Sequence, residues 1–187
     1  MPAGWTRFND SCGHVHIEYR GADVPPANAP ANPVAVHRFW SPVYQGHFYI
    51  VDAAERDRII TRWPGTWSYE GQRYTAFASQ AAGTVPLYRF WSAQYNGHFF
   101  TADAVERDRV ISRWPGTWSY EGVAYYVYPA TSSQPNTVAV SRFWSPTVLH
   151  HFYTASTQER DQVTSKWGHI WSFEGESFRV PAAGVTG

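Results

Sequence analysis

The sequence predicts a single β-rich domain of the α+β class, built from three tandem copies of one unit. The stretch HRFWSPVYQGHFY at residues 37–49 returns as YRFWSAQYNGHFF and again as SRFWSPTVLHHFY. The landmarks that follow it keep the same offsets in every copy, so all insertions fall in the connecting segments QAAGT and TSSQPNT, which are rich in small and polar residues. The three copies cover residues 34–79, 85–130 and 138–183.

Each copy begins with a predicted β-hairpin. The segment AVHRFWS alternates its faces as a strand does, with Arg38 and Trp40 on one side and His37 and Phe39 on the other. SPVYQG is typical of a turn, and GHFYI then resumes the alternation. Two antiparallel strands joined by a longish loop follow from this pattern.

A short helix is predicted after the hairpin. Asp52 followed three residues later by Glu55 forms a capping box, and the other copies repeat it. Ile59 or Ile60 shares a helix face with Trp63, at i+4 or i+3, and Pro64 then ends the element. The capping box explains Glu55, whereas the Arg-Asp pair after it is predicted to make surface or inter-copy ion pairs. The equivalent capping pairs are Asp103 with Glu106 and Ser156 with Glu159.

The end of each copy returns to strand-like alternation in TWSYEGQRYTAF, interrupted at Glu70-Gly71, where glycine suits a turn or bulge. Each unit is therefore predicted as ββαββ, which is too small to cover its own apolar face. We expect the three units to close around a pseudo-threefold axis in a β-trefoil-like domain with a short helix in each lobe. An open stack of the three units is the alternative.

The first 33 residues differ from the repeats. HVHIEY alternates like a strand, and VPPANAPANP has the composition of an extended linker. We expect residues 1–33 to lay one strand against a repeat domain that spans residues 34–187.

Composition excludes several classes of function. The chain has 187 residues with 15 basic and 15 acidic side chains, so there is no positive field that would attract nucleic acid. No apolar run is long enough to insert in a membrane, and the single cysteine, Cys12, has no internal partner for a disulfide. No signal peptide is visible, which predicts a cytoplasmic protein, or an extracellular one if the chain is a recloned mature domain.

The aromatic content points to sugar binding. Aromatic residues make up 18% of the chain, more than an ordinary aliphatic core needs. A sugar site needs aromatic rings for the C–H faces of a pyranose and planar polar groups for its hydroxyls. Candidate residues of these types recur in the first two copies: Arg38, Trp40, Tyr44, Gln45, His47, Glu70, Arg89, Trp91, Tyr95, Asn96, His98 and Glu121.

Comparing the copies separates scaffold from site. RFW is identical in all three, as a packing seam would be, so we expect Phe39 and Trp40 to be buried and the turn residues Tyr44 and Tyr95 to lie on the surface. The third copy has TVLH where the others have VYQG and QYNG. Two strong sites and one degenerate site are predicted.

Metal and catalytic chemistry are not supported by the motifs. Three equivalent histidines, His47, His98 and His151, suit zinc if they meet, but no carboxylate stands beside them in sequence, and we expect them to bond backbone groups. A glycosidase pair needs one asymmetric cleft rather than three copies, and GxSxG and phosphate-binding glycine loops are absent from the sequence. We predict no catalysis, no metal and no cofactor.

With RFW, GHFY or GHFF, ERD and YEG in constant order over about 150 residues, the chain resembles an uncharacterised three-repeat family of fungal and bacterial proteins. Many members of that family occur beside hydrolase domains, which implies an attachment or carbohydrate-binding role. The sequence thus predicts a lectin-like protein whose repeated weak sites bind glycans or glycoconjugates with avidity. The alternative is a protein-interaction or hydrolase-inhibitor module that uses the loops between the copies. The oligomeric state and the sugar are left open.

Overall fold

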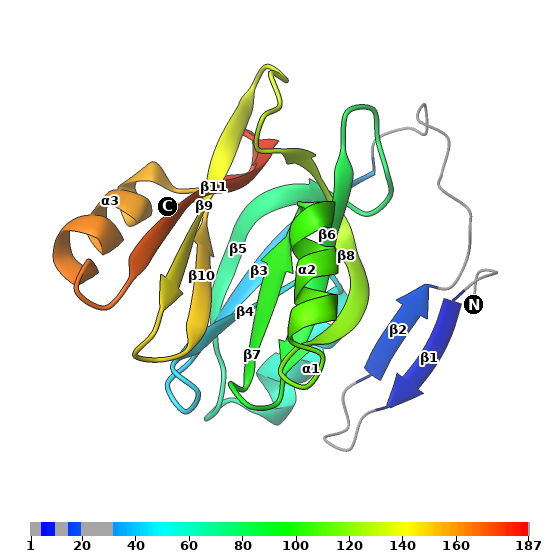
Figure 1. Ribbon diagram of the computed structural model, residues 1–187, viewed down its shortest axis with the longest axis vertical. Helices are drawn as coiled ribbons and strands as arrows, with labels where there is room; N and C mark the ends of the chain where they lie inside the picture. The colour runs from blue at the N-terminus through cyan, green and yellow to red at the C-terminus, as the bar shows by residue number, and fades with distance from the viewer. Residues whose placement is uncertain (1–4, 10–14, 20–31, 187) are drawn as a thin grey trace.

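The computed structural model describes residues 5–9, 15–19 and 32–186, in which each copy folds as strand, strand, helix, strand (Figure 1). The first copy contains β3 (Pro33–Ser41), β4 (Gly46–Ile50), α1 (Ala53–Arg62) and β5 (Ser68–Phe77). The second contains β6 (Val85–Ser92), β7 (Gly97–Thr101), α2 (Ala104–Arg113) and β8 (Ser119–Pro129). The third contains β9 (Thr137–Ser145), β10 (His150–Thr154), α3 (Thr157–Trp167) and β11 (Ser172–Pro181).

The predicted fourth strand of each unit is wrong, because the segment after the helix forms one long strand. Its Glu-Gly step is a bulge, where β5 shifts register against β3. Gly71 has φ 93°, in the left-handed region that glycine adopts without steric cost. Each unit is therefore ββαβ, with the first strand between its hairpin partner and the long strand.

Nine strands from the three copies join in one antiparallel sheet. The long strand β8 links the copies, pairing with β5 at Phe77–Tyr126 and with β11 at Phe178–Pro129 and Arg179–Tyr128. The continuous path runs β10-β9-β11-β8-β5-β3-β4, and β6 with β7 branches from β8. The sheet does not close, so that part of the expectation is wrong, and the trefoil-like symmetry stays a prediction.

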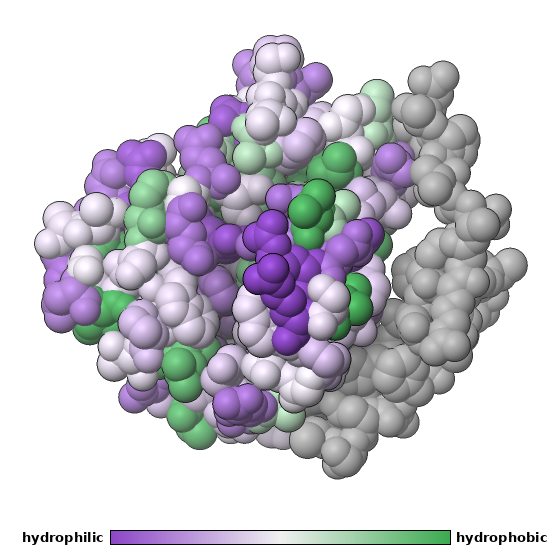
Figure 2. All heavy atoms as spheres, viewed as in Figure 1, coloured by the Kyte–Doolittle hydropathy of each residue, from purple (hydrophilic) through white to green (hydrophobic). Residues whose placement is uncertain are grey.

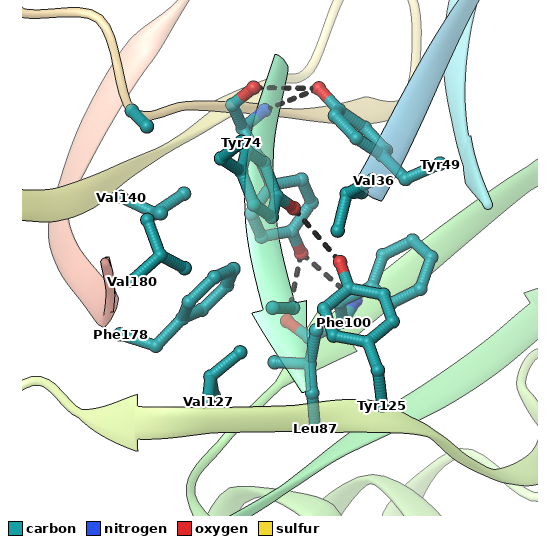
Figure 3. Packing of buried hydrophobic residues seen from close by; sticks show 13 residues of the cluster. Val36, Tyr49, Tyr74, Leu87, Phe100, Tyr125, Val127, Val140, Phe178 and Val180 are labelled. Carbon is teal, nitrogen blue, oxygen red and sulfur yellow. Dashed lines mark hydrogen bonds between the residues drawn. The ribbon is translucent and has the colours of Figure 1, made fainter. Parts of the chain in front are cut away.

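The core sits where the inner strands β4, β7 and β10 meet. Tyr49, Phe100 and Tyr153 occupy equivalent positions on these strands, and their ring centroids lie 5.7 to 6.0 Å apart with edge-to-face angles (Figure 3). Tyr74 and Tyr125 join this cluster and share a hydrogen bond of 2.8 Å between their hydroxyls. Many of the aromatic residues therefore build the core, with their polar atoms paired inside it.

Each copy also has a smaller cluster beneath its helix. In the first copy, Phe39, Phe48, Ile50 and Ile59 are buried, and Trp67 packs against them. The burial of Phe39 is as predicted, whereas Trp40 is only half-buried.

The predicted N-caps are confirmed in all three helices. The Asp52 carboxylate accepts a hydrogen bond from the Glu55 amide at 2.8 Å, and Asp103 and Ser156 cap α2 and α3 in the same way. Trp63 ends α1 as its C-cap residue. The helices lie on the outside of the sheet, and hydrophilic side chains gather over α2 in the view of Figure 2.

The leader contributes β1 (Trp5–Asn9) and β2 (Val15–Tyr19), which pair with each other in a separate two-stranded sheet. β2 lies beside β8. The predicted linker at residues 24–33 and Cys12 fall almost entirely outside the described residues. Among the residues that are described, no helix is long and apolar enough to cross a membrane.

Candidate functional site between the first and second copies

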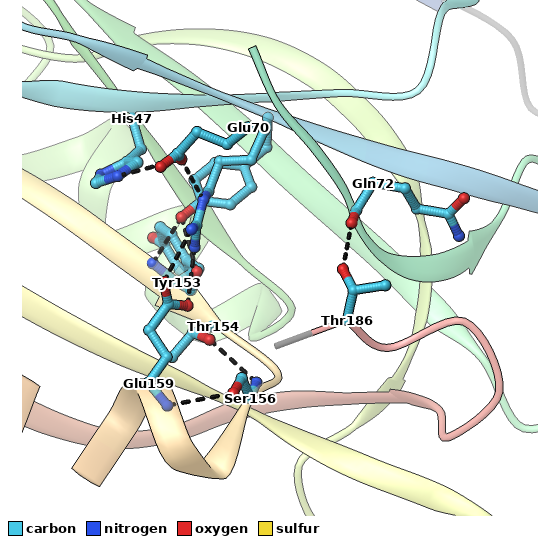
Figure 4. Close-up of polar contacts among 10 residues, drawn as sticks. His47, Glu70, Gln72, Tyr153, Thr154, Ser156, Glu159 and Thr186 are labelled. Carbon is cyan, nitrogen blue, oxygen red and sulfur yellow. Dashed lines mark hydrogen bonds and ion pairs between the residues drawn. The ribbon is translucent and has the colours of Figure 1, made fainter. Parts of the chain in front are cut away.

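Two of the three copies are joined to a neighbouring copy through the arginine of their RFW motif. Arg38 donates two hydrogen bonds to the carboxylate of Glu159, which lies in the first turn of α3. The nitrogen–oxygen distances in this bidentate pair are 2.9 and 2.8 Å (Figure 4). Arg142 donates in the same way to the carboxylate of Glu106 in α2, with nitrogen–oxygen distances of 2.8 and 3.1 Å. The glutamate half of the predicted capping box is therefore wrong in these two copies, because the N-cap amides of Asp103 and Ser156 donate to the hydroxyls of Thr101 and Thr154 instead. Each glutamate binds a guanidinium in the next copy with fork geometry.

The arginine also meets a glutamate of its own copy. Arg38 Nε donates to Glu70 Oε2 at 2.6 Å, and Arg142 Nε donates to Glu174 Oε2 at 2.9 Å. Glu70 was predicted as a sugar-binding residue, and its partner in the structure is the RFW arginine across the bulge. Burial by itself would lower the pKa of Arg38, but the hydrogen bonds that its guanidinium donates to Glu159 raise it, so this guanidinium stays charged.

A histidine completes each of these polar groups. His47 Nε2 lies 3.5 Å from Glu70 Oε2, and the His47 ring packs on Trp40 with centroids 4.8 Å apart. Burial, followed by the nearby Arg38, holds the pKa of His47 well below its ordinary value, so the imidazole is neutral. Burial and Arg142 likewise lower the pKa of His151 to about 3.

The sequence expectation for these histidines is corrected by this geometry, because the partner of each ring is a carboxylate 23 residues away rather than a backbone group. The rings alternate with phenylalanines of the neighbouring copies: His47 with Phe152, His98 with Phe48, and His151 with Phe99. Within the described part of the chain, no group of three potential ligands is placed to hold a metal.

The departure of the third copy from the pattern has a packing cause. His150 takes the position of Gly46 and Gly97, and these glycines provide the space for its ring. A Cβ atom at Gly46 would lie 2.9 Å from His150 Nδ1, and one at Gly97 would be closer still. His150 Nε2 donates to the Tyr44 carbonyl oxygen at 2.8 Å. One imidazole thus fills a space that three equivalent side chains could not share.

The junction between the first and second copies contains a cavity of about 430 Å³. Its walls come from α1 and β4 of the first copy and from β6, β7 and the start of β8 in the second, with His150 of the third copy. This volume falls within the roughly 300–1,000 Å³ typical of small-molecule sites. The cavity therefore has the size of a small-molecule binding site.

Aromatic and charged side chains line the cavity together. Tyr44, Trp63, Trp67 and Trp91 contribute rings, and Trp63 is 41% exposed. Among the described residues, three arginines and two glutamates also line the cavity, and together these five side chains carry a formal charge of one positive unit. These charged residues are Arg58, Arg62, Arg89, Glu55 and Glu121.

Seven of the twelve predicted site residues line this cavity. They are Tyr44, His47, Arg89, Trp91, Asn96, His98 and Glu121. The other five are not part of its lining, and Arg38 is only 2% exposed within its two carboxylates. Tyr95 packs on Trp118 at 5.7 Å, as Tyr44 packs on Trp67. The five are Arg38, Trp40, Gln45, Glu70 and Tyr95.

Sequence reasoning missed the wall that α1 provides. Arg58, Arg62 and Trp63 were read only as helix residues, and Glu55 only as a capping residue. Glu55, Arg58 and Arg62 follow one another at steps of three and four residues, and Trp63 adjoins Arg62. This spacing places them on neighbouring positions of a helix surface, and it was a usable signal. Which copy that surface would face was not visible in the sequence.

Comparison with known proteins identifies a family but no function. A family model described as a domain of unknown function, DUF5648, matches residues 14–128 and then residues 128–186. No curated protein and no solved structure is detectably similar to the chain.

Proposed function

The chain belongs to this family of unknown function, and we propose that it is a carbohydrate-binding, lectin-like protein whose sugar site is the cavity between the first two copies. The observation that carries the proposal is the lining itself. It combines several large aromatic side chains with arginine, asparagine and glutamate in a cavity of about 430 Å³. That combination serves the two demands of a pyranose, apolar C–H faces and outward hydroxyls.

The aromatic walls would hold the ring of the sugar. Trp63 ends α1 and is 41% exposed, while Trp91 comes from the facing copy and is half-buried against His98. A tryptophan on either wall allows the C–H face of a pyranose to pack on its ring without displacing core residues. Burying one face of a sugar on such a ring contributes free energy by removing apolar surface from water.

The polar groups would select the hydroxyls. Asn96 is exposed on the turn before β7, with φ 51°, a left-handed conformation that asparagine tolerates. Its amide offers both a hydrogen-bond donor and an acceptor. The carboxylate of Glu121 adds an acceptor and the guanidinium of Arg89 adds donors. Such fixed, planar groups favour one arrangement of hydroxyls over another.

The proposal places binding in one cavity rather than in two equal sites. The equivalent arginines of the first and third copies are enclosed by carboxylates on both sides. A sugar at those junctions would have to displace a buried two-pronged ion pair, at a cost of several kcal/mol. With one site in each chain, avidity would require several protein molecules to bind the same target, because the repeats within one chain would not each supply a site.

A glycan array followed by calorimetry tests this function, with the repeats supplying a matched control. Trp63→Ala removes the exposed ring at the cavity, and Trp114→Ala removes the equivalent ring of α2, which is 46% exposed and outside the cavity lining. The proposal expects Trp63→Ala to weaken sugar binding at least tenfold and Trp114→Ala to leave it within twofold. Absence of binding to every glycan by folded protein, or equal losses in the two variants, would overturn it.

A further inference from the structure

The three equivalent arginines do not have equal surroundings. Arg38 is 2% exposed, Arg142 is 15% exposed, and Arg89 is 22% exposed. The first two each bind a carboxylate from the helix of another copy through both outer nitrogens. The fold therefore presents the same guanidinium three times, and in two of the three places a carboxylate sits on its outer edge.

At the third place the outer edge borders the cavity. Arg89 Nε lies 2.8 Å from Glu121 Oε2, the counterpart of the inner contacts of Arg38 and Arg142. Glu121 is only 5% exposed, so the inner side of Arg89 is enclosed while its side chain lines the cavity. The ion pair with Glu121 therefore holds the Arg89 guanidinium in position at the cavity.

Two further arginines strengthen the positive field there. Arg58 and Arg62 extend from α1 and line the same cavity. Together with Arg89 they carry three positive charges. This is one more than the two negative charges of Glu55 and Glu121. A partly enclosed site with excess positive charge favours an anionic ligand, because the low-dielectric walls screen the attraction less than water does.

We propose that the sugar this cavity takes carries a carboxylate, as uronic and sialic acids do, and that the carboxylate binds the outer edge of Arg89. The pairs Arg38–Glu159 and Arg142–Glu106 supply the template, since each has a carboxylate on the equivalent edge at 2.8 to 3.1 Å. The inference rests on the proposed sugar-binding function and adds the class of sugar. Fork-to-fork pairing adds geometric selection to the charge attraction.

Glu55 gives the inference a second, independent consequence. It lines the cavity from the first turn of α1, at the position that Glu106 and Glu159 hold in the other copies. Its negative charge opposes an entering carboxylate. Neutralising it should therefore strengthen the binding of an acidic sugar while leaving a neutral sugar with little change.

The test measures dissociation constants by calorimetry for matched sugars. Methyl glucuronide and methyl galacturonide are compared with their methyl esters, and N-acetylneuraminic acid with its methyl ester, so that each pair differs only in charge. The inference expects the free acid to bind at least tenfold more tightly than its ester, with a preference that declines as salt is raised. Equal binding of acid and ester would overturn the inference and leave the sugar-binding function standing.

Variants locate the preference at the arginine. Arg89→Lys keeps the charge and loses the fork, and it should reduce the preference for acid at least fivefold. Glu55→Gln should raise affinity for the acid about threefold or more, a gain that damage to the fold cannot produce. Arg109→Lys, on α2 at the position equivalent to Arg58 and outside the cavity lining, is the control and should change neither value.

Two outcomes separate the inference from the function it rests on. Unchanged preference in Arg89→Lys together with no gain in Glu55→Gln would place the carboxylate elsewhere and overturn the inference alone. Failure of folded protein to bind any acid or ester would overturn both the inference and the sugar-binding function. Thermal unfolding of each variant checks that the comparison is made on folded protein.

Discussion

The hydroxyl of Tyr153 makes two hydrogen bonds with the backbone of Phe100, donating to its carbonyl oxygen at 2.8 Å and accepting from its amide at 2.9 Å. Tyr49 makes the same two bonds with the backbone of Tyr153, at 2.7 and 3.0 Å. Phe100 is the equivalent residue of the second copy and carries no hydroxyl. Two copies are thus tied to their neighbours by a buried phenol, and the third is held by packing.

Phe100→Tyr should restore the missing link. By equivalence its hydroxyl would lie against the backbone of Tyr49, and a satisfied hydrogen bond contributes about 1 kcal/mol. We expect the free energy of unfolding in urea to rise by about that amount. A fall of more than about 1 kcal/mol would show that the position has no room for the oxygen.

Arg38→Met should destabilise the domain strongly. The change removes a guanidinium that is 2% exposed and leaves Glu159 without its two-pronged partner, at a cost on the order of 3 kcal/mol. Arg56→Met is the control, because Arg56 pairs with the exposed Asp57 and such surface pairs contribute about 0–1 kcal/mol. Similar losses for the two variants in urea unfolding would contradict the role assigned to the Arg38–Glu159 pair.

Stability should decline as the pH falls from 7 to 5. The pKa values of His47 and His151 are lowered in the folded state by burial and by Arg38 and Arg142, respectively, that of His151 to about 3. The unfolded chain takes up these protons below about pH 6.5 while the folded chain does not. Each histidine therefore lowers the free energy of unfolding by up to about 1.4 kcal/mol per pH unit in this window.

The groups around these rings define the variant for the pH experiment. His151 faces Arg142, Glu174 and His150, and the pKa of His150 is itself lowered by burial. His151→Gln should reduce the pH slope by the share of one histidine. An unaltered slope in His151→Gln would contradict the burial of a neutral imidazole there.

Gly97→Ala should destabilise the centre of the fold, because its Cβ would overlap the His150 ring. Overpacking of this kind costs about 1–3 kcal/mol. In a His150→Gly background the same change should cost less than half as much, which a double-mutant cycle measures. Gly116→Ala is the control, since a Cβ there meets no atom within 4 Å. Equal costs in both backgrounds would refute the packing account of the third copy.

Local elements of the fold were predictable because they depend on neighbouring residues. The hairpins follow from alternating residues, and the helix cap follows from Asp52 three residues before Glu55. The bulge follows from Gly71, which adopts a φ of 93° in the structure. The single long strand β5 was read as two, because a bulge and a turn share the same Glu-Gly signal. Closure of the sheet depends on long-range pairing between copies, for which a single sequence carries no signal.

The candidate site was predictable in part for the same reason. The sequence groups Arg89, Trp91 and His98 because they sit on one face of a predicted hairpin, and all three line the cavity. The contribution of Trp63 depends on how α1 of one copy faces β6 of the next. The enclosure of Arg38 by Glu159 depends on a contact across 121 residues, and this contact separates a buried clamp from an accessible site.

A crystal structure of the protein with the glycan that binds it most tightly would show where the sugar lies. We expect a sugar ring in the cavity between α1 and β6–β7, packed against Trp63 or Trp91 and within hydrogen-bond distance of Arg89. A sugar seated instead on the α2 surface at Trp114, or on the loops between copies, would contradict this expectation.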